Sequence, residues 1–308
     1  MKDGSVEIEN RPGGMSGHAA ALLVRSLRPR QWTKNLVVFA GLLFSQNLFD
    51  PVLAARALAA FVLFCLLTGA IYLLNDVLDY ERDRLHPQKR HRPVASGALP
   101  RATAAAAGLA LLAGALGGAF GLARPFGWTA LAYAALITAY SFGLKHLVIV
   151  DVLVVALGFV LRAVAGAVVI RVEISPWLII CTLLLALFMA CGKRRHELLA
   201  LEGNATDHRP ILAEYTPQLL DQMIAVVTAS TVLAYALYTL SAETVAKFGT
   251  SWLSLTIPFV LYGIFRYLYL LYRRELGGNP SELFLADGPL LLDIALWGLA
   301  VIAILYFR

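Results

Sequence analysis

The chain has 308 residues, of which 59% are hydrophobic and only 15% are charged, and its mean hydropathy is +0.71. A soluble domain of this length carries more charge and fewer long apolar runs, so the composition excludes a water-soluble globular protein. The three cysteines lie in or beside apolar runs without CxxC or Cys/His spacing, which argues against a zinc site and against a disulfide scaffold. The bilayer must therefore be the solvent for most of the chain.

The polar start of the chain precedes nine apolar segments. Residues 1–24 are expected to be a flexible cytoplasmic tail, because they include the longest polar stretch of the chain. No cleavable signal peptide is expected, because the first twenty residues lack an apolar core. Residues 25–308 are expected to form a single transmembrane domain. Its apolar segments lie at residues 33–49, 52–74, 102–122, 126–142, 148–169, 174–192, 221–240, 252–272 and 289–306. Each is close to the ~20 residues that a helix needs to cross ~30 Å of hydrocarbon, which predicts an all-α integral membrane protein with nine transmembrane helices.

The distribution of basic residues predicts the orientation of these helices. With the N-terminus in the cytoplasm, nineteen Lys and Arg residues fall on the cytoplasmic side and five on the other side. The positive-inside rule therefore predicts a multi-pass protein of the plasma membrane in this orientation. The net charge of +6 describes its cytoplasmic face, which suits anionic lipid, and no nucleic-acid partner is expected. The long cytoplasmic loops follow the second and sixth segments, so the active site is expected on this face.

The densest charge of the chain directly follows the second apolar segment, in the sequence NDVLDYERDRLHPQKRHRP at residues 75–93. If the helix continues through this stretch, Asn75, Asp76, Asp79 and Asp83 fall within an arc of about 100° over roughly two turns. Carboxylates on one face repel one another unless a cation lies between them, and oxygen-only ligands suit Mg²⁺. The sequence therefore predicts a magnesium site on these four residues.

Basic residues follow the acidic face within ten residues, at Lys89, Arg90 and Arg92. Carboxylates that hold Mg²⁺ beside cations that hold phosphate oxygens are the groups that a diphosphate leaving group needs. The alternative is a solvated cytoplasmic loop with paired surface charges. The concentration of the acids on one face favours the metal–diphosphate site.

The spacing of Asn75, Asp76, Asp79 and Asp83 resembles the NDxxDxxxD signature of the UbiA superfamily of intramembrane prenyltransferases. Nine helices, with long cytoplasmic loops after helices two and six, resemble the architecture of that superfamily. The resemblance implies that Asp76, Asp79 and Asp83 are catalytic residues that act through Mg²⁺ and a diphosphate.

Ordinary members of the superfamily carry a second aspartate-rich motif after helix six. Here that segment reads GKRRHELLALEGNATDHRP at residues 192–210, where Lys193, Arg194, Glu197, Glu202 and Asp207 remain. Other stretches resemble the decaprenyl-phosphate phosphoribosyltransferase branch: LRPRQWTKNLVVFAGLLFS at 27–45, YSFGLKHLVIVD at 140–151, GFVLRAVAGA at 158–167, KRRHEL at 193–198 and PSELFLADGPLLL at 280–292.

The branch resemblance implies transfer of 5-phosphoribose from phosphoribosyl pyrophosphate to a polyprenyl phosphate, with release of diphosphate. The product is the lipid-linked precursor of cell-wall arabinose in actinobacteria. The Mg²⁺–diphosphate then belongs to a water-soluble donor, and the lipid is the acceptor. A homo-oligomer is compatible with the sequence.

Two anionic substrates require many cations. The residues expected to bind substrate phosphates are Arg28, Lys34, Asn75, Lys89, Arg90, Arg92, Tyr140, Lys145, Arg162, Lys193 and Arg194. Five of them have alternatives. Arg28 and Lys34 could be cytoplasmic anchors of the first segment, Lys145 could be an ordinary basic residue of its short cytoplasmic loop, and Tyr140 could be an interface aromatic. Arg162 lies deep in the fifth segment and must face a cavity or a partner, so a structural ion pair with another helix is equally compatible with its position.

Two other functions remain open. An aromatic prenyltransferase of the same superfamily needs the second aspartate motif, which is missing here. A transporter of phosphorylated lipids or anions predicts polar residues along several spans and has no use for a magnesium face.

Overall fold

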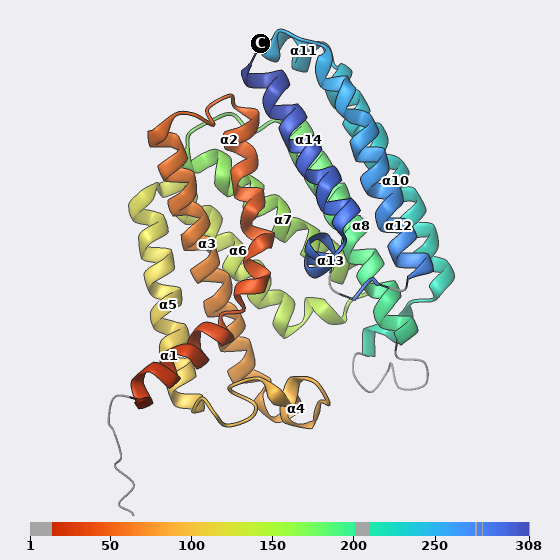
Figure 1. The fold of residues 1–308 in the computed structure, drawn as a ribbon. Helices are drawn as coiled ribbons and strands as arrows, with labels where there is room; N and C mark the ends of the chain where they lie inside the picture. The colour runs from red at the N-terminus through yellow and green to blue at the C-terminus, as the bar shows by residue number, and fades with distance from the viewer. Residues whose placement is uncertain (1–13, 201–209, 275, 279, 308) are drawn as a thin grey trace, which may run out of the picture.

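The structure is a computed structural model that describes residues 14–200, 210–274, 276–278 and 280–307. These residues form helices and connecting loops without a strand, which confirms the all-α prediction. The longer helices shown in Figure 1 are α1 (Gly14–Ser26), α3 (Pro51–Leu78), α5 (Arg101–Leu122), α6 (Arg124–Phe142), α7 (Val150–Val169), α8 (Pro176–Ala200), α10 (Pro217–Leu240), α12 (Ile257–Arg273) and α14 (Gly288–Tyr306). The shorter elements are η1 (Pro29–Phe39), α2 (Ala40–Phe44), α4 (Tyr80–Leu85), η2 (Lys89–His91), η3 (Leu144–His146), η4 (Pro210–Glu214), α11 (Ala242–Phe248), η5 (Trp252–Thr256) and α13 (Pro280–Ala286).

Several long helices begin with a side-chain N-cap and a proline in the first turn. The Asp50 side chain accepts backbone N–H bonds at the start of α3, and Thr216 does so at the start of α10. A proline follows each of these residues in the first helical turn, where its missing N–H costs nothing. Asp287 caps α14 in the same way, by accepting from the Leu290 N–H.

The helices form two groups with separate hydrophobic cores. The first core joins residues of α3, α5 and α6 with the C-terminal part of α7, and the second joins α8, α10 and α12 with Val152 near the start of α7. Figure 1 shows α3, α5 and α6 on one side, α8, α10, α12 and α14 on the other, and α7 between them. Because α7 packs on both groups, residues at its ends can connect the two halves.

The segment η1–α2 packs closely against α7. A Cβ atom on Gly166 would lie 1.8 Å from the Val38 carbonyl oxygen, and one on Gly41 would lie 3.0 Å from the Ala167 Cα. Only glycine permits this approach of one backbone to another. The two glycines therefore place η1, with Asn35 buried on it, inside the first half of the bundle.

Of two predictions about the helices, one stays a prediction and the other is wrong. In the described part of the chain, seven helices are long and apolar enough to cross a membrane, and the segments predicted at 33–49 and 126–142 are not among them, so nine crossings stay a prediction. The first of these segments is wound as the 3₁₀ element η1 followed by the short α2, and the second is the 19-residue α6. The predicted continuous helix through residues 75–83 is wrong, because α3 ends at Leu78 and α4 begins at Tyr80.

The elements at the two ends of the bundle can be followed in Figure 1. Within the expected tail, the structure forms α1 from Gly14. Figure 1 shows α4 and the end of α8 at one end of the bundle, and α11 with the C-terminus at the opposite end. The C-terminal ends of α3 and α8 therefore lie at the same end of the bundle.

Candidate functional site

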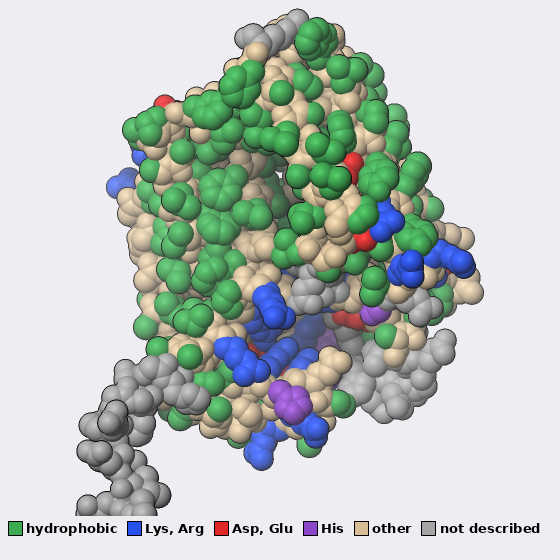
Figure 2. Space-filling model, viewed as in Figure 1, with side chains coloured by type: hydrophobic (Ala, Val, Ile, Leu, Met, Phe, Trp, Pro, Cys, Tyr) green, Lys and Arg blue, Asp and Glu red, His purple; other side chains and the backbone are tan. Residues whose placement is uncertain are grey.

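Basic side chains gather at the end of the molecule that carries α4. Figure 2 shows Lys and Arg side chains in a hollow at this end, below a surface on which hydrophobic side chains predominate.

The acidic residues Asp76 and Asp83 share one arginine. The Arg92 Nη1 atom lies 3.0 Å from Asp76 Oδ1 and 2.6 Å from Asp83 Oδ2, and both aspartates are buried. Arg28 donates to the same Asp76 Oδ1 at 2.5 Å, and its guanidinium lies 4.8 Å from the centre of the Tyr72 ring. These contacts draw α4 and the loop after it back onto the end of α3. The break at Asp79 (φ −87°, ψ 10°) makes this return possible.

The other two predicted cations of this loop lie close by. Lys89 Nζ is 3.8 Å from Asp83 Oδ1, whereas Arg90 is exposed and its Nε donates to His91 Nε2 at 3.4 Å. The structure therefore brings Lys89 to the acidic pair and leaves the Arg90 side chain at the solvent-facing side of the loop.

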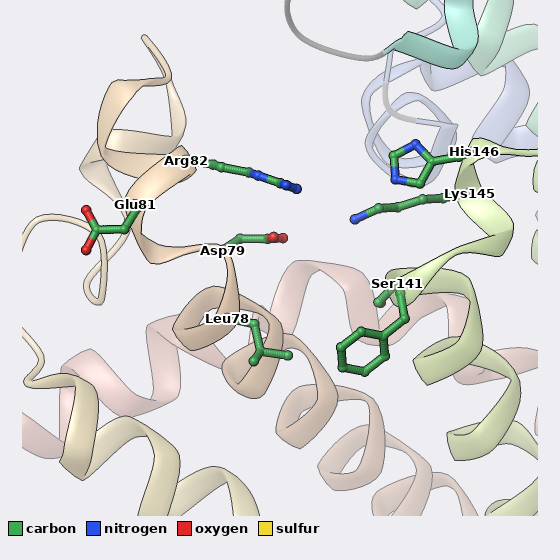
Figure 3. A pocket seen from close by; sticks show the side chains of 8 residues that line it. Leu78, Asp79, Glu81, Arg82, Ser141, Lys145 and His146 are labelled. Carbon is green, nitrogen blue, oxygen red and sulfur yellow. The ribbon is translucent and has the colours of Figure 1, made fainter.

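Asp79 faces a separate pocket of about 390 Å³. The pocket is lined by Leu78, Asp79, Glu81, Arg82, Ser141, Phe142, Lys145 and His146. Figure 3 shows Asp79 and Arg82 reaching from one wall toward Lys145 and His146 on the other, while the Glu81 carboxylate turns away. One acid and two permanent cations thus converge from the segments after α3 and after α6.

Asn75 connects the two walls of this pocket. Its Nδ2 donates to Ser141 Oγ at 3.1 Å, and Ser141 in turn donates to the Ile137 carbonyl within α6. The amide of Asn75 therefore fixes the end of α3 against the end of α6, beside the pocket.

A second polar cluster lies at the start of α7 and the end of α8. Arg194 donates to Asp151 Oδ2 at 2.6 Å, to Glu197 Oε2 at 2.7 Å and to the Tyr140 hydroxyl at 3.1 Å. The Tyr215 hydroxyl donates to Asp151 Oδ1 at 2.6 Å. Burial raises the pKa of Tyr215, and the hydrogen bond to Asp151 raises it further, so this hydroxyl remains protonated and a donor.

The remaining cations of the prediction are distributed over other elements. Lys193 lies 3.6 Å from Glu197 Oε1, and Lys34 is half-buried on η1. Glu202 and Asp207, the other acids of the second loop, lie outside the described residues.

Arg162 lies inside the bundle, with 5% of its surface exposed. It donates from Nε to Asn35 Oδ1 at 2.7 Å, from Nη1 to the Gly158 carbonyl at 2.9 Å and from Nη2 to the Tyr133 hydroxyl at 2.7 Å. These partners belong to η1, α6 and α7, so the structure places Arg162 in an interhelical polar network. Its predicted contact with a substrate phosphate stays a prediction.

Four residues near the predicted groups were not selected as site residues from the sequence. Arg82 lies three residues after Asp79, so helical spacing could have found it. Ser141 and His146 are close to Lys145 in the sequence, so their proximity to the predicted cation could have been inferred from the sequence. Tyr215 carries no such signal, because it is 64 residues from its partner Asp151.

The residues at the end of α3 have the chemistry that a magnesium ion needs. Asp76, Asp79, Asp83 and Asn75 offer oxygen donors, and a single cationic nitrogen of Arg92 already bridges Asp76 and Asp83. Among the described residues, no group of three or more His, Cys, Asp or Glu side chains is arranged to hold a metal ion. Asp76 and Asp83 are thus the two acids that the structure brings together, and Asp79 is turned toward the neighbouring pocket.

The chain is similar to known proteins over most of its length. The profile of the UbiA prenyltransferase family matches residues 35–287. The chain is 34% identical over 293 residues to a decaprenyl-phosphate phosphoribosyltransferase of Corynebacterium glutamicum, covering 92% of this chain and 86% of that protein. It is 34% identical over 296 residues to a decaprenyl-phosphate phosphoribosyltransferase of Mycolicibacterium smegmatis, covering 92% of each chain.

Solved structures show the same fold. A UbiA homologue from Archaeoglobus fulgidus, bound to GPP and Mg²⁺, superposes with a TM-score of 0.69 at 20% identity, covering 92% of this chain and 99% of that one. The profile match spans most of the chain, and the helical bundle has the same architecture. The chain therefore belongs to the UbiA prenyltransferase family, a family of multi-pass membrane proteins.

Proposed function

We propose that this protein transfers 5-phosphoribose from phosphoribosyl pyrophosphate to a polyprenyl phosphate such as decaprenyl phosphate, and releases diphosphate. The observation that carries the proposal is the 34% identity, over 92% of this chain, to two decaprenyl-phosphate phosphoribosyltransferases. The product serves as a lipid-linked precursor for cell-wall arabinan. The transmembrane domain of residues 25–308 carries the catalytic site.

The reaction requires little acid–base chemistry from the protein. A phosphate oxygen of the lipid attacks C1 of the ribose, the bond from C1 to the diphosphate oxygen breaks, and the diphosphate leaves with the electron pair. Attack in line with the leaving group inverts the configuration at C1. Because nucleophile and leaving group are both anionic, positioning and charge neutralisation supply most of the rate enhancement.

The cations of the site support that role. Arg28, Lys89 and Arg92 surround the acidic pair, and Arg82 and Lys145 converge on the adjacent pocket. Side chains of this kind hold phosphate oxygens of both substrates and oppose their mutual repulsion. Asp76 and Asp83, with Asp79 and Asn75 beside them, would hold Mg²⁺, which when bound would neutralise charge on the leaving diphosphate.

We further propose nine membrane crossings with the site on the cytoplasmic side of the plasma membrane. A 3₁₀ helix rises about 2.0 Å per residue and an α-helix about 1.5 Å, so η1 and α2 together reach roughly 30 Å and α6 roughly 28 Å. Both lengths are close to the ~30 Å of hydrocarbon, although neither segment meets the criterion of an apolar spanning helix. The excess of nineteen basic residues over five supports the orientation.

The test offers purified protein in detergent two donors, phosphoribosyl pyrophosphate or a prenyl diphosphate, each with polyprenyl phosphate or an aromatic acid. We expect lipid-linked phosphoribose from the first donor and polyprenyl phosphate, in the presence of Mg²⁺ and not in EDTA. Prenylated aromatic product would contradict the proposal and favour the alternative activity of this family.

Variants of the acidic residues assign the metal site. We expect Asp79→Asn and Asp83→Asn to lower turnover by at least 100-fold, on the order of the loss of a group that stabilises transition-state charge. Glu81→Gln is the matched control, because Glu81 belongs to the same segment and turns away from the pocket (Figure 3). Activity retained in Asp83→Asn would show that the acidic pair does not hold the metal.

A further inference from the structure

The turn between α6 and α7 carries Lys145 and His146 into the pocket opposite Asp79. One arginine holds both ends of this turn. Arg194 on α8 donates to the Tyr140 hydroxyl near the end of α6, at 3.1 Å, and to Asp151 in the first turn of α7, at 2.6 Å. The position of the turn therefore depends on a residue of the other half of the bundle.

The backbone of the same turn is strained. Ile149 has φ 67° and ψ −44°, a conformation that a β-branched residue rarely adopts. Such a conformation persists only where surrounding contacts hold it. Here the Ile149 N–H donates to the Tyr215 hydroxyl at 2.7 Å, and the same hydroxyl donates to Asp151 at 2.6 Å.

Tyr215 and Asp151 cannot touch a substrate in this arrangement. Asp151 has none of its surface exposed, and Tyr215 has 3%. Each uses its polar atoms within the protein, on Arg194, on the Ile149 backbone and on one another. Any effect of these two residues on the reaction must therefore pass through the groups that they hold.

We propose that Asp151 and Tyr215 are positioning residues, which fix the strained turn so that Lys145 meets an anionic group of the donor in the pocket. Tyr215 directly follows η4, at the far end of the loop after α8. Tyr215 thus acts on the site through the placement of Lys145. This inference rests on the proposed phosphoribosyl transfer, in which the donor brings the phosphate groups.

The kinetic test uses Tyr215→Phe, which removes one hydroxyl and keeps the packed ring. We expect the KM for phosphoribosyl pyrophosphate to rise about tenfold, the cost of a lost buried hydrogen bond, with kcat within about twofold. Tyr267→Phe is the control, since Tyr267 is equally buried and its hydroxyl has no hydrogen-bond partner among the described residues. An unchanged KM in Tyr215→Phe would overturn the inference.

A double-mutant cycle shows whether the effect passes through Lys145. If it does, Tyr215→Phe raises the KM in the wild-type background and adds less than about twofold in Lys145→Met. Independent, multiplicative effects of the two substitutions would contradict the proposed route.

Hydrogen exchange provides a readout that does not require activity. We expect the backbone amides of residues 144–151 to exchange at least tenfold faster in Tyr215→Phe than in wild type, because Ile149 loses its acceptor. If wild type transfers no phosphoribose and this exchange still increases, the proposed function fails while the structural coupling stands. Unchanged exchange shows that Tyr215 does not hold the turn.

Discussion

At the scale of single residues, Arg162 is buried in the first half of the bundle with all three of its nitrogens hydrogen-bonded. Arg162 donates to Asn35, to the Gly158 carbonyl and to Tyr133, and Asn35 also donates to Thr68 Oγ1 at 3.4 Å. A buried charge is expensive in a membrane protein unless its donors are satisfied. The planar guanidinium donates hydrogen bonds to acceptors on η1, α6 and α7 at once, which indicates that Arg162 stabilises the first half of the bundle.

We therefore expect Arg162→Lys to lower the thermal stability of the protein, which the loss of a phosphate contact alone would not do. Lysine keeps the charge but cannot reproduce the planar fork, so Asn35 or Tyr133 loses its partner at a cost of about 1–3 kcal/mol. The measurement is thermal unfolding in detergent beside the transfer assay. A fall in transfer with an unchanged Tm would instead support the predicted role of Arg162 in substrate binding.

The residues of the acidic site could be predicted from the sequence, but most of their ion-pair partners depend on the tertiary structure. Spacing alone grouped Asp76 and Asp83 with the basic residues of the next loop, and the structure brings both onto Arg92. Spacing could not show that Arg28 also reaches Asp76, because the two are 48 residues apart. Pairs of this kind depend on how η1 and α3 pack, which a period or a motif does not encode.

At the scale of elements, the contact between η1–α2 and α7 depends on the absence of a side chain. A Cβ on Gly166 would lie 1.8 Å from the Val38 carbonyl oxygen, and this oxygen belongs to the backbone and cannot rotate away. Gly117 on α5 has nothing within 4 Å of the same position. The two glycines therefore offer a matched comparison of a packing contact with an open surface.

We expect Gly166→Ala to destabilise the protein by about 3 kcal/mol, the upper range for an overpacked contact. Gly117→Ala should be neutral or stabilising by roughly 0.5–1 kcal/mol, because alanine favours a helix interior. Thermal unfolding in one detergent measures both variants. Equal Tm values would mean that η1 moves away from α7 without cost.

A second element-scale contact makes stability depend on pH. The Arg266 guanidinium donates to both carboxylate oxygens of Asp287, at 3.0 and 2.8 Å, which ties α12 to the start of α14. These hydrogen bonds lower the pKa of Asp287 below its ordinary value, and the Leu290 N–H lowers it further. Because the folded-state pKa is lowered, the stabilisation is complete above the unfolded pKa of about 3.9 and is lost as pH falls through the folded-state value.

Asp287→Asn isolates this contribution, since asparagine can still cap α14. We expect the variant to have a lower Tm than wild type at pH 6, and the difference to stay constant down to about pH 5 and to shrink as the pH falls below about 4. Thermal unfolding over this range measures the difference. A gap that stays constant with pH would show that charge on Asp287 does not stabilise the contact.

Element positions followed from hydropathy, whereas helix type and breaks did not. The predicted segments at 102–122 and 289–306 match α5 and α14 within one residue. Hydropathy cannot distinguish 3₁₀ from α winding, so η1 was predicted as part of a single helix. The break at Asp79 was missed for a related reason: Arg92 bends α4 back through contacts that lie outside the helix itself.

At the scale of the whole molecule, the two halves meet where the cations gather. The first half supplies Asp76, Asp83 and the Arg92 loop, the second supplies Arg194, and α7 carries Asp151 between them. Sequence predicted that both long loops contribute to one face, and Figure 1 shows α4 and the end of α8 at the same end. The orientation of this end relative to the membrane remains a prediction from the charge count.

The orientation can be tested with single cysteines in a variant that lacks Cys65, Cys181 and Cys191. Ser96 and Ser251 are both exposed, and they lie on the loops beside α4 and α11, at opposite ends of the bundle in Figure 1. A membrane-impermeant maleimide should label Ser251→Cys in intact cells and Ser96→Cys only after permeabilisation. The reverse pattern would place the acidic site outside the cell, away from a cytoplasmic phosphoribosyl donor.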